Sequence, residues 1–215
     1  MVRAAINEGK NWNTMMSKYS LLGIGVVFGL AMVLAGWFFF DQSYTYQGVL
    51  IDPPATAFDF ELTDQYGEPF QLSDQRGNVV LIFFGYTNCP DVCPVTLSEF
   101  KRIKEQLGDQ AERVRFVYIT VDPERDSQER VQAYLNNFDP NFIGLVGERE
   151  SLEPIWEAYG VYAERQDVGS AAGYLIDHTA RTYLIDAQGN WRLNYPFGIE
   201  TAKITEDIQH LLKEE

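Results

Sequence analysis

The chain holds two cysteines, Cys89 and Cys93, in the motif CPDVC. Two thiols at this spacing can bind a soft metal ion together, or they can interconvert between a dithiol and a disulfide. The spacing alone leaves both open, although redox pairs more often have two intervening residues. Closing so short a loop would stabilise the fold by only about 2 kcal/mol in the chain-entropy description, which argues against a purely structural disulfide. We therefore predict reactive cysteines.

A strand and a helix must position these cysteines. The apolar run 79–84 is too short for a helix and rich in β-formers, which predicts a central strand buried on both faces. Pro94 suits the first position of a helix, and apolar residues recur at helical spacing from Leu97 onward, so we expect a helix to begin at Cys93. The positive end of its dipole favours thiolate, and both cysteines are expected to be more acidic than a free thiol.

The other predicted elements give the fold class. We expect an opening β-hairpin over 58–72, a second buried strand at 114–121, a helix around 131–138, a short strand at 143–146, a helix at 152–159, a hairpin of strands 181–185 and 191–195, and a closing helix over 204–212. This order predicts an α/β, thioredoxin-like fold with an added N-terminal hairpin and insertions. Sites in such sheets form at strand C-terminal ends, where the cysteines and the loop beginning at Asp122 would lie.

An uncharged run of twenty residues, Leu21–Phe40, precedes this domain. At about 1.5 Å per residue it reaches roughly 30 Å, enough for a single transmembrane helix. Basic residues outnumber acidic ones before the run, which favours a cytoplasmic N-terminus. A cleaved signal peptide is the alternative, but the run is long for one and lacks a small-x-small site. The predicted order is a cytoplasmic segment at 1–18, a transmembrane anchor at 19–40, a linker at 41–57 and an extracytoplasmic domain at 58–215.

The charge of the chain excludes one class of partner. Its formal net charge is −14, so binding to nucleic acid is effectively excluded. Acidity mostly reports solubility, and we infer no partner from it.

Few soft metal ligands are available in the domain. All four methionines lie at or before Met32, which leaves the two cysteines, His178 and His210. His210 lies near the end of the closing helix, where a solvated imidazole is ordinary. His178 precedes the last hairpin, in a segment that the thioredoxin plan brings against the cysteine loop. Cys89, Cys93 and His178 would make a three-coordinate site suited to copper, since thiolates favour Cu(I) and the nitrogen helps accommodate Cu(II). A closed zinc site would want a fourth ligand.

Three separated motifs carry a resemblance to a known family. CPDVC, VDPERD at 121–126 and DHT at 177–179 resemble the Sco/SenC family of membrane-tethered copper proteins. The resemblance implies a domain on the outer face of the membrane that helps assemble the binuclear copper centre of cytochrome c oxidase. It also implies copper ligation by the two motif cysteines and the motif histidine. The expected partners are the oxidase's copper-bearing subunit and an upstream copper donor.

The roles of two loop carboxylates stay open. Asp91 and Asp122 are candidates for supporting the ligands or contacting a partner, and both could equally be solvated loop carboxylates.

Other functions of the two cysteines also stay open. The cysteines could act as a thiol-disulfide oxidoreductase that reduces an exported partner such as the oxidase subunit. This role is compatible with copper binding, because copper needs the reduced cysteine pair. Copper transfer requires no catalytic turnover, so the copper function does not require the chain to be an enzyme. The peroxidase pattern PxxxTxxC fits neither cysteine. An interaction module with an inert disulfide is the last alternative.

Overall fold

The computed structural model describes residues 29–33, 44–170 and 173–214. The chain divides into two compact units, Met1–Thr45 and Tyr46–Glu215. In the first unit, residues 29–33 are helical. Within the described stretches, no helix has the length and apolar character needed to cross a membrane. Most of the predicted anchor at 19–40 lies outside the described residues, so the sequence alone carries that prediction.

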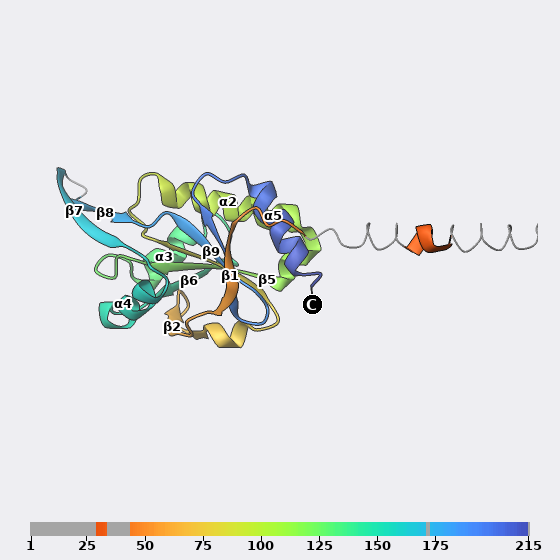
Figure 1. Ribbon diagram of the computed structural model, residues 1–215. Helices are drawn as coiled ribbons and strands as arrows, with labels where there is room; N and C mark the ends of the chain where they lie inside the picture. Colours follow the sequence, from red (N-terminus) through yellow and green to blue (C-terminus); the bar gives the residue numbers. More distant parts are fainter. Residues whose placement is uncertain (1–28, 34–43, 171–172, 215) are drawn as a thin grey trace, which may run out of the picture. The chain divides into compact units, whose positions relative to one another are not determined.

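A mixed sheet forms the centre of the second unit (Figure 1). Its strands are β1 (Val49–Thr56), β2 (Glu61–Asp64), β3 (Pro69–Gln71), β4 (Val79–Gly85), β5 (Val114–Thr120), β6 (Ile143–Val146), β9 (Arg181–Ile185) and β10 (Asn190–Pro196). Their spatial order is β1-β10-β9-β4-β5-β6-β2-β3. The strands β4, β5 and β6 are parallel, and the outer strands pair antiparallel. Parallel pairing brings the C-terminal ends of β4 and β5 to one edge.

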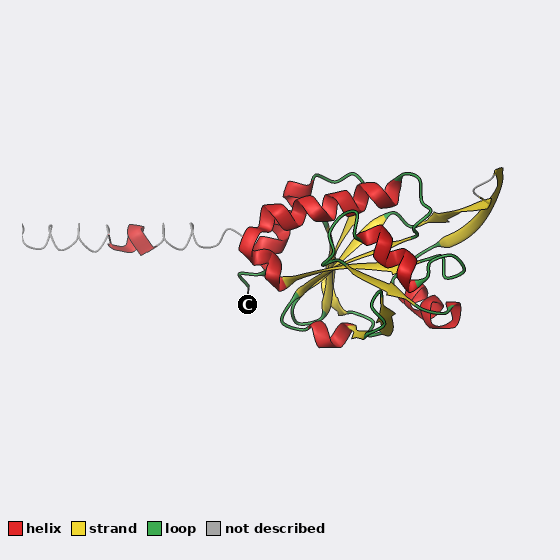
Figure 2. Cartoon of the chain, turned by 180° about the vertical axis from the view of Figure 1, so that it is seen from behind, coloured by secondary structure: helices red, strands yellow, loops and turns green. Residues whose placement is uncertain are grey.

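Helices connect and cover these strands. They are α2 (Val92–Leu107), α3 (Gln128–Leu135), α4 (Arg149–Ala158) and α5 (Thr201–Leu211), with 3-10 turns η1 (Leu72–Gln75) and η2 (Gly108–Arg113). The helices α2 and α5 lie side by side along the sheet (Figure 2). The helix α3 packs on β6 so closely that a Cβ at Gly144 would collide with Val131 and Leu135.

The predicted order of elements is confirmed. Every residue of β4 is buried, as expected for an apolar central strand between β5 and β9. The opening hairpin β2–β3, the hairpin β9–β10 and the closing helix α5 are present. The cysteine helix begins at Val92, one residue before the predicted start. The cysteines therefore lie where β4 gives way to α2.

The predicted linker at 41–57 is wrong over its second half. Residues 49–56 form β1, which pairs antiparallel with β10 at the edge of the sheet. The register shifts between Leu50 and Ala55, around the two prolines that suggested an extended linker. Proline lacks an amide donor, but an edge strand tolerates it at such an irregularity.

A second difference concerns the segment before the last hairpin. Strands β7 (Ala163–Ser170) and β8 (Gly173–His178) form a separate two-stranded sheet, which reaches beyond the main one (Figure 1). Its first strand, AERQDVGS, lacks the alternation of apolar and polar residues that predicts a strand. His178 therefore ends a strand of this hairpin.

Candidate metal centre

The two cysteines flank the start of α2. The carbonyl oxygen of Tyr86 accepts a hydrogen bond of 3.2 Å from the amide of Cys89. The amide of Cys93 in turn donates a hydrogen bond of 3.5 Å to the sulfur of Cys89. Cys89 is half-buried, whereas Cys93 is completely buried, and both are free thiols. Cys89 is thus partly open to solvent, whereas Cys93 is enclosed by the protein.

His178 completes the cluster from the end of β8. Its Nε2 atom lies 3.5 Å from the sulfur of Cys93, and its Nδ1 atom lies 3.3 Å from the carbonyl oxygen of Thr179. Two aromatic rings meet the imidazole edge to face, Phe83 at 6.0 Å and Tyr86 at 5.7 Å between centroids. The imidazole is therefore held between the backbone at Thr179, just after β8, and the aromatic rings at the end of β4.

The three ligand atoms of Cys89, Cys93 and His178 all lie within 4.8 Å of one another. Sulfur and nitrogen ligands about 2.0–2.3 Å from a first-row ion lie roughly 3.5–4 Å apart, so a small adjustment would close them around one ion. Among the described residues, no other group of three or more Cys, His, Asp or Glu side chains is placed to hold a metal. Two soft sulfurs and one imidazole suit copper in either common oxidation state.

The two thiols have opposite acidities. The hydrogen bond donated by the thiol of Cys93 lowers the pKa of Cys89 to about 3, with further help from His178 and from the amides of Asp91 and Cys93. Burial raises the pKa of Cys93 well above its ordinary value, and the neighbouring Cys89 sulfur adds to the rise. The predicted acidity is confirmed for Cys89 and wrong for Cys93, because desolvation outweighs the helix dipole there. The pair thus holds one proton, on the buried sulfur.

Gly85 makes room for the buried sulfur. A Cβ atom built on this residue would lie 2.9 Å from the sulfur of Cys93 and 3.0 Å from a ring carbon of Tyr118. Such separations are shorter than van der Waals contact, so any larger residue would displace one of these groups. Glycine at the end of β4 is therefore needed for the sulfur to sit where it does.

The loop after β5 supports the cysteine loop. Asp126 accepts hydrogen bonds from the amide and hydroxyl of Thr87, at 3.1 and 2.6 Å, and from the hydroxyl of Thr120 at 2.8 Å. Burial raises the pKa of Asp126, and these hydrogen bonds oppose the rise. Arg130 also donates to Thr87, at 2.9 Å, and to Asn88. The residues just before Cys89, Thr87 and Asn88, are thus held in place by Asp126 and Arg130.

The two loop carboxylates singled out from the sequence differ in their surroundings. Asp91 is exposed at the start of α2. Asp122 is completely buried and accepts hydrogen bonds from Arg125 and from the hydroxyl of Tyr174, at 2.5 and 2.6 Å. The interpretation of Asp122 as a solvated loop carboxylate is therefore wrong, because its charge is enclosed and paired.

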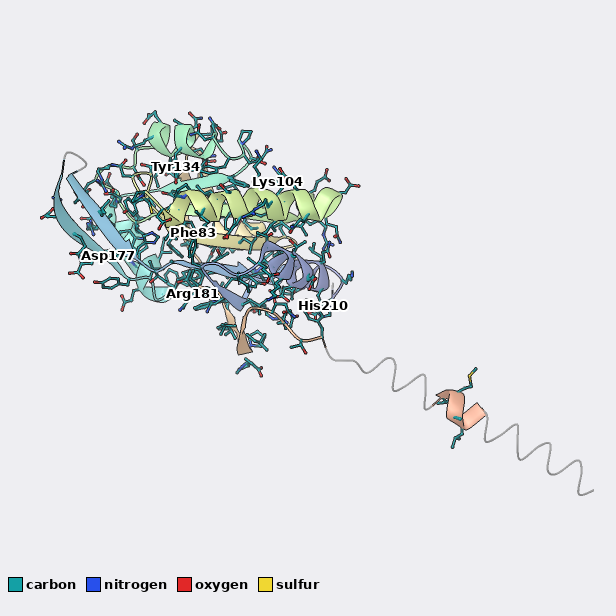
Figure 3. The ribbon with its side chains drawn as sticks, turned by 90° about the horizontal axis from the view of Figure 1, so that it is seen from above. Phe83, Lys104, Tyr134, Asp177, Arg181 and His210 are labelled. Carbon is teal, nitrogen blue, oxygen red and sulfur yellow. The ribbon has the colours of Figure 1, made fainter. Side chains whose placement is uncertain are left out.

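His210 lies apart from the cluster. Figure 3 shows Asp177, which precedes His178, toward one end of the domain and His210 on α5 toward the other, with Phe83 between them. The His210 ring makes an edge-to-face contact with Tyr46, and its Nε2 atom lies 3.1 Å from a carboxylate oxygen of Glu214. The second histidine therefore belongs to the packing at the end of α5.

Several residues that support this site were not predicted from the sequence. Asp126 stands in the VDPERD motif, four residues after Asp122, and the motif itself was the available signal. Gly85 and Tyr174 carried no such signal, because their importance comes from contacts with residues distant in the sequence.

Known proteins share this sequence and fold. The family model described as SCO1/SenC matches residues 50–213. A SCO2-like protein of Rickettsia felis is 38% identical over 152 residues, which cover 70% of this chain and 74% of that protein. The family-model match covers the main sheet from Leu50 onward and all three motifs.

Solved structures agree. ScoI of Bradyrhizobium japonicum with copper bound has 35% identity and a TM-score of 0.68, covering 74% of this chain and 100% of that one. Apo Sco1 of Thermus thermophilus has 37% identity and a TM-score of 0.70, covering 80% and 99%. With its thioredoxin-like α/β fold and its matching sequence, the chain belongs to the SCO1/SenC family.

Proposed function

We propose that this chain binds one copper ion through Cys89, Cys93 and His178 and transfers it to the copper-bearing subunit of cytochrome c oxidase. The observation that carries the proposal is the convergence of these three ligand atoms within 4.8 Å. The copper bound to the ScoI relative supports the choice of metal. The oxidase as recipient, and an upstream donor, follow from the family resemblance of the three motifs.

The proposal includes a location. The uncharged run at 21–40 would anchor the chain in the membrane once, within the segment 19–40, with residues 1–18 in the cytoplasm. The domain would then face the extracytoplasmic side. Labelling an engineered single cysteine, at position 5 or at position 213 of a chain without Cys89 and Cys93, with a membrane-impermeant maleimide in intact cells tests this. Reaction at position 213 alone is expected, and reaction at position 5 alone would reverse the orientation.

Copper titration of the reduced full-length chain tests the ligand set. We expect one copper per chain, with thiolate-to-Cu(II) absorption bands in the Cu(II) form. Cys89→Ser, Cys93→Ser and His178→Ala should each abolish tight binding of Cu(II) while the domain stays folded. His210→Ala is the matched control, since His210 lies outside the cluster, and it should bind like the wild type. Full retention of the bands in His178→Ala would remove the imidazole from the site.

A second function is favoured by the acidic thiolate of Cys89 next to the protonated thiol of Cys93. Such a pair can attack a partner's disulfide with Cys89 and resolve the mixed disulfide with Cys93. Exchange with an exported protein's disulfide should then persist in His178→Ala and disappear in either cysteine variant. A Cys89–Cys93 disulfide that stays inert at physiological potentials would exclude this function.

A further inference from the structure

The histidine of the site and the cysteines belong to different sheets. Cys89 and Cys93 follow β4 of the main sheet, whereas His178 ends β8 of the two-stranded sheet. The distance between the sulfurs and the imidazole therefore depends on two things: the short link from His178 to β9 of the main sheet, which begins at Arg181, and the attachment of the β7–β8 hairpin itself to the main sheet.

A buried carboxylate makes that attachment. Tyr174 on β8 donates its hydroxyl proton to Asp122 over 2.6 Å. Arg125 donates from Nε to the other carboxylate oxygen over 2.5 Å and from Nη1 to the carbonyl oxygen of Tyr174 over 2.9 Å. Its guanidinium lies 3.5 Å from the centroid of the Tyr174 ring. We name these three residues the Asp122 clamp.

The clamp acts on the strand that carries the imidazole. Tyr174, Ile176 and His178 alternate along β8 and so project toward the same face. The amide of Ile176 donates to the hydroxyl of Tyr86 over 3.2 Å, which adds a second attachment between the clamp and the histidine. The clamp lies about 13 Å from His178 along the strand, at about 3.3 Å per residue. A strand held at both points has little freedom to move its end.

The same loop also holds the other half of the site. Asp126, four residues after Asp122, accepts hydrogen bonds from Thr87 beside the cysteine loop. The segment 122–126 is thus bonded to both the cysteine loop and the histidine hairpin. Any shift of the hairpin relative to this segment would change the sulfur-to-nitrogen separation.

We propose that Asp122, Arg125 and Tyr174 are positioning residues for His178, which they hold against the two sulfurs without contacting the metal. The proposal rests on the proposed copper function. Without the clamp the two cysteines would keep their geometry and continue to bind Cu(I), because thiolates suffice for that ion. Binding of Cu(II), which uses the imidazole nitrogen, would weaken. The clamp therefore sets which oxidation state of copper the site can retain.

Tyr174→Phe is the sharpest variant, since it removes one hydroxyl and keeps the ring under Arg125. Tyr183→Phe is the matched control, because the buried hydroxyl of Tyr183 meets no hydrogen-bond partner among the described residues. Asp122→Asn is the second variant, and the thermal unfolding of each full-length protein shows that it is folded.

The first measurement uses the metal-free, reduced chain. In the wild type and in Tyr183→Phe, nuclear Overhauser contacts should join the His178 ring to the rings of Phe83 and Tyr86. We expect Tyr174→Phe to weaken these contacts and to speed hydrogen exchange at the Ile176 amide at least tenfold, with α2 unchanged. Unchanged contacts and exchange in Tyr174→Phe would overturn the positioning role, whatever the copper results.

The second measurement titrates Cu(I) and Cu(II) separately under anaerobic conditions. Tyr174→Phe and Asp122→Asn should lose at least tenfold in Cu(II) affinity, with weaker nitrogen coupling in the electron paramagnetic resonance spectrum, and should change less than threefold in Cu(I) affinity. Equal losses for both ions would indicate a merely structural role and overturn the proposal. A wild-type chain that binds neither ion would instead contradict the proposed copper function, while the metal-free measurement still decides the positioning role.

Discussion

The amide of Cys93, in the first turn of α2, donates its hydrogen bond to the sulfur of Cys89 over 3.5 Å. The positive N-terminal end of α2 therefore stabilises the negative charge on the sulfur of the neighbouring, half-exposed Cys89. Cys93 itself is buried and keeps its proton. One short motif thus gives an exposed thiolate beside a protected thiol.

This arrangement predicts a selective reaction with iodoacetamide. In the reduced, metal-free chain, Cys89 should be alkylated first, because its pKa of about 3 leaves it as thiolate. Its rate should stay nearly constant between about pH 5 and 8, where a free thiol's rate would rise close to tenfold per pH unit. Peptide mapping by mass spectrometry measures both sites. In Cys93→Ala the donated hydrogen bond is lost, so the Cys89 rate should become pH-dependent. First modification at Cys93 would contradict the assignment.

The same pKa shift predicts how stability depends on pH. Folding lowers the pKa of Cys89 from an ordinary 9.0 to about 3. Its contribution to the free energy of unfolding is therefore complete above pH 9 and is lost as the pH falls toward 3. Denaturant unfolding at pH 8 and pH 5 measures the difference. Cys89→Ser should show a smaller decrease than the wild type, and an identical decrease would remove Cys89 from the effect.

Gly85→Ala should damage the site more than an equal clash elsewhere. The new methyl group would press on the sulfur of Cys93, and overpacking of this kind costs about 1–3 kcal/mol of stability. Gly144→Ala is the matched control, because its methyl group would clash with α3, away from the cysteines. Both variants should unfold at lower denaturant concentration. Only Gly85→Ala should also lower copper affinity, and equal affinities in the two would contradict the role given to Gly85.

Asp126→Ala should loosen the cysteine loop. It leaves the amide and hydroxyl of Thr87 and the hydroxyl of Thr120 without their acceptor, and buried unsatisfied groups cost about 1–3 kcal/mol each. We expect at least about 2 kcal/mol of destabilisation and faster hydrogen exchange at the Thr87 amide. Asp126→Asn keeps one accepting oxygen and should lose less. A variant as stable as the wild type would show that the three bonds contribute little.

Asp207→Ala should release the first residues of the domain. Asp207 is completely buried on α5 and accepts hydrogen bonds from the amides of Gln47 and Gly48 and from the hydroxyl of Tyr195, each at 3.0 Å for its shortest contact. Exchange at the Gln47 and Gly48 amides should speed up, measured by mass spectrometry. The alkylation rate of Cys89 should not change, since the metal centre is built from other elements.

The fold was largely predictable because its signals are local. The buried run at 79–84, the proline at the helix start and the two hairpins each have a pattern that a short window of sequence contains. The strands β1, β7 and β8 were missed, and for β1 and β7 the reason is the opposite one. Their residues are mostly polar or proline-rich, and they pair only because β10 and β8 offer partners.

The candidate site was predictable in its ligands and less so in its support. Ligand chemistry narrowed the choice to two cysteines and two histidines, and fold topology separated His178 from His210. Which sulfur carries the proton could not be predicted, because it depends on the complete burial of Cys93. The contacts of Gly85 and Tyr174 also arise only in the folded chain.

The ligands of the cluster differ in when they can assemble. Cys89 and Cys93 are neighbours in the chain and meet through local folding, whereas His178 is 85 residues beyond Cys93. During synthesis the two sulfurs thus emerge long before the nitrogen, and the trio is complete only after the hairpin has docked. A fully coordinated ion would therefore mark a finished domain, and an immature or truncated copy would offer only the sulfur pair.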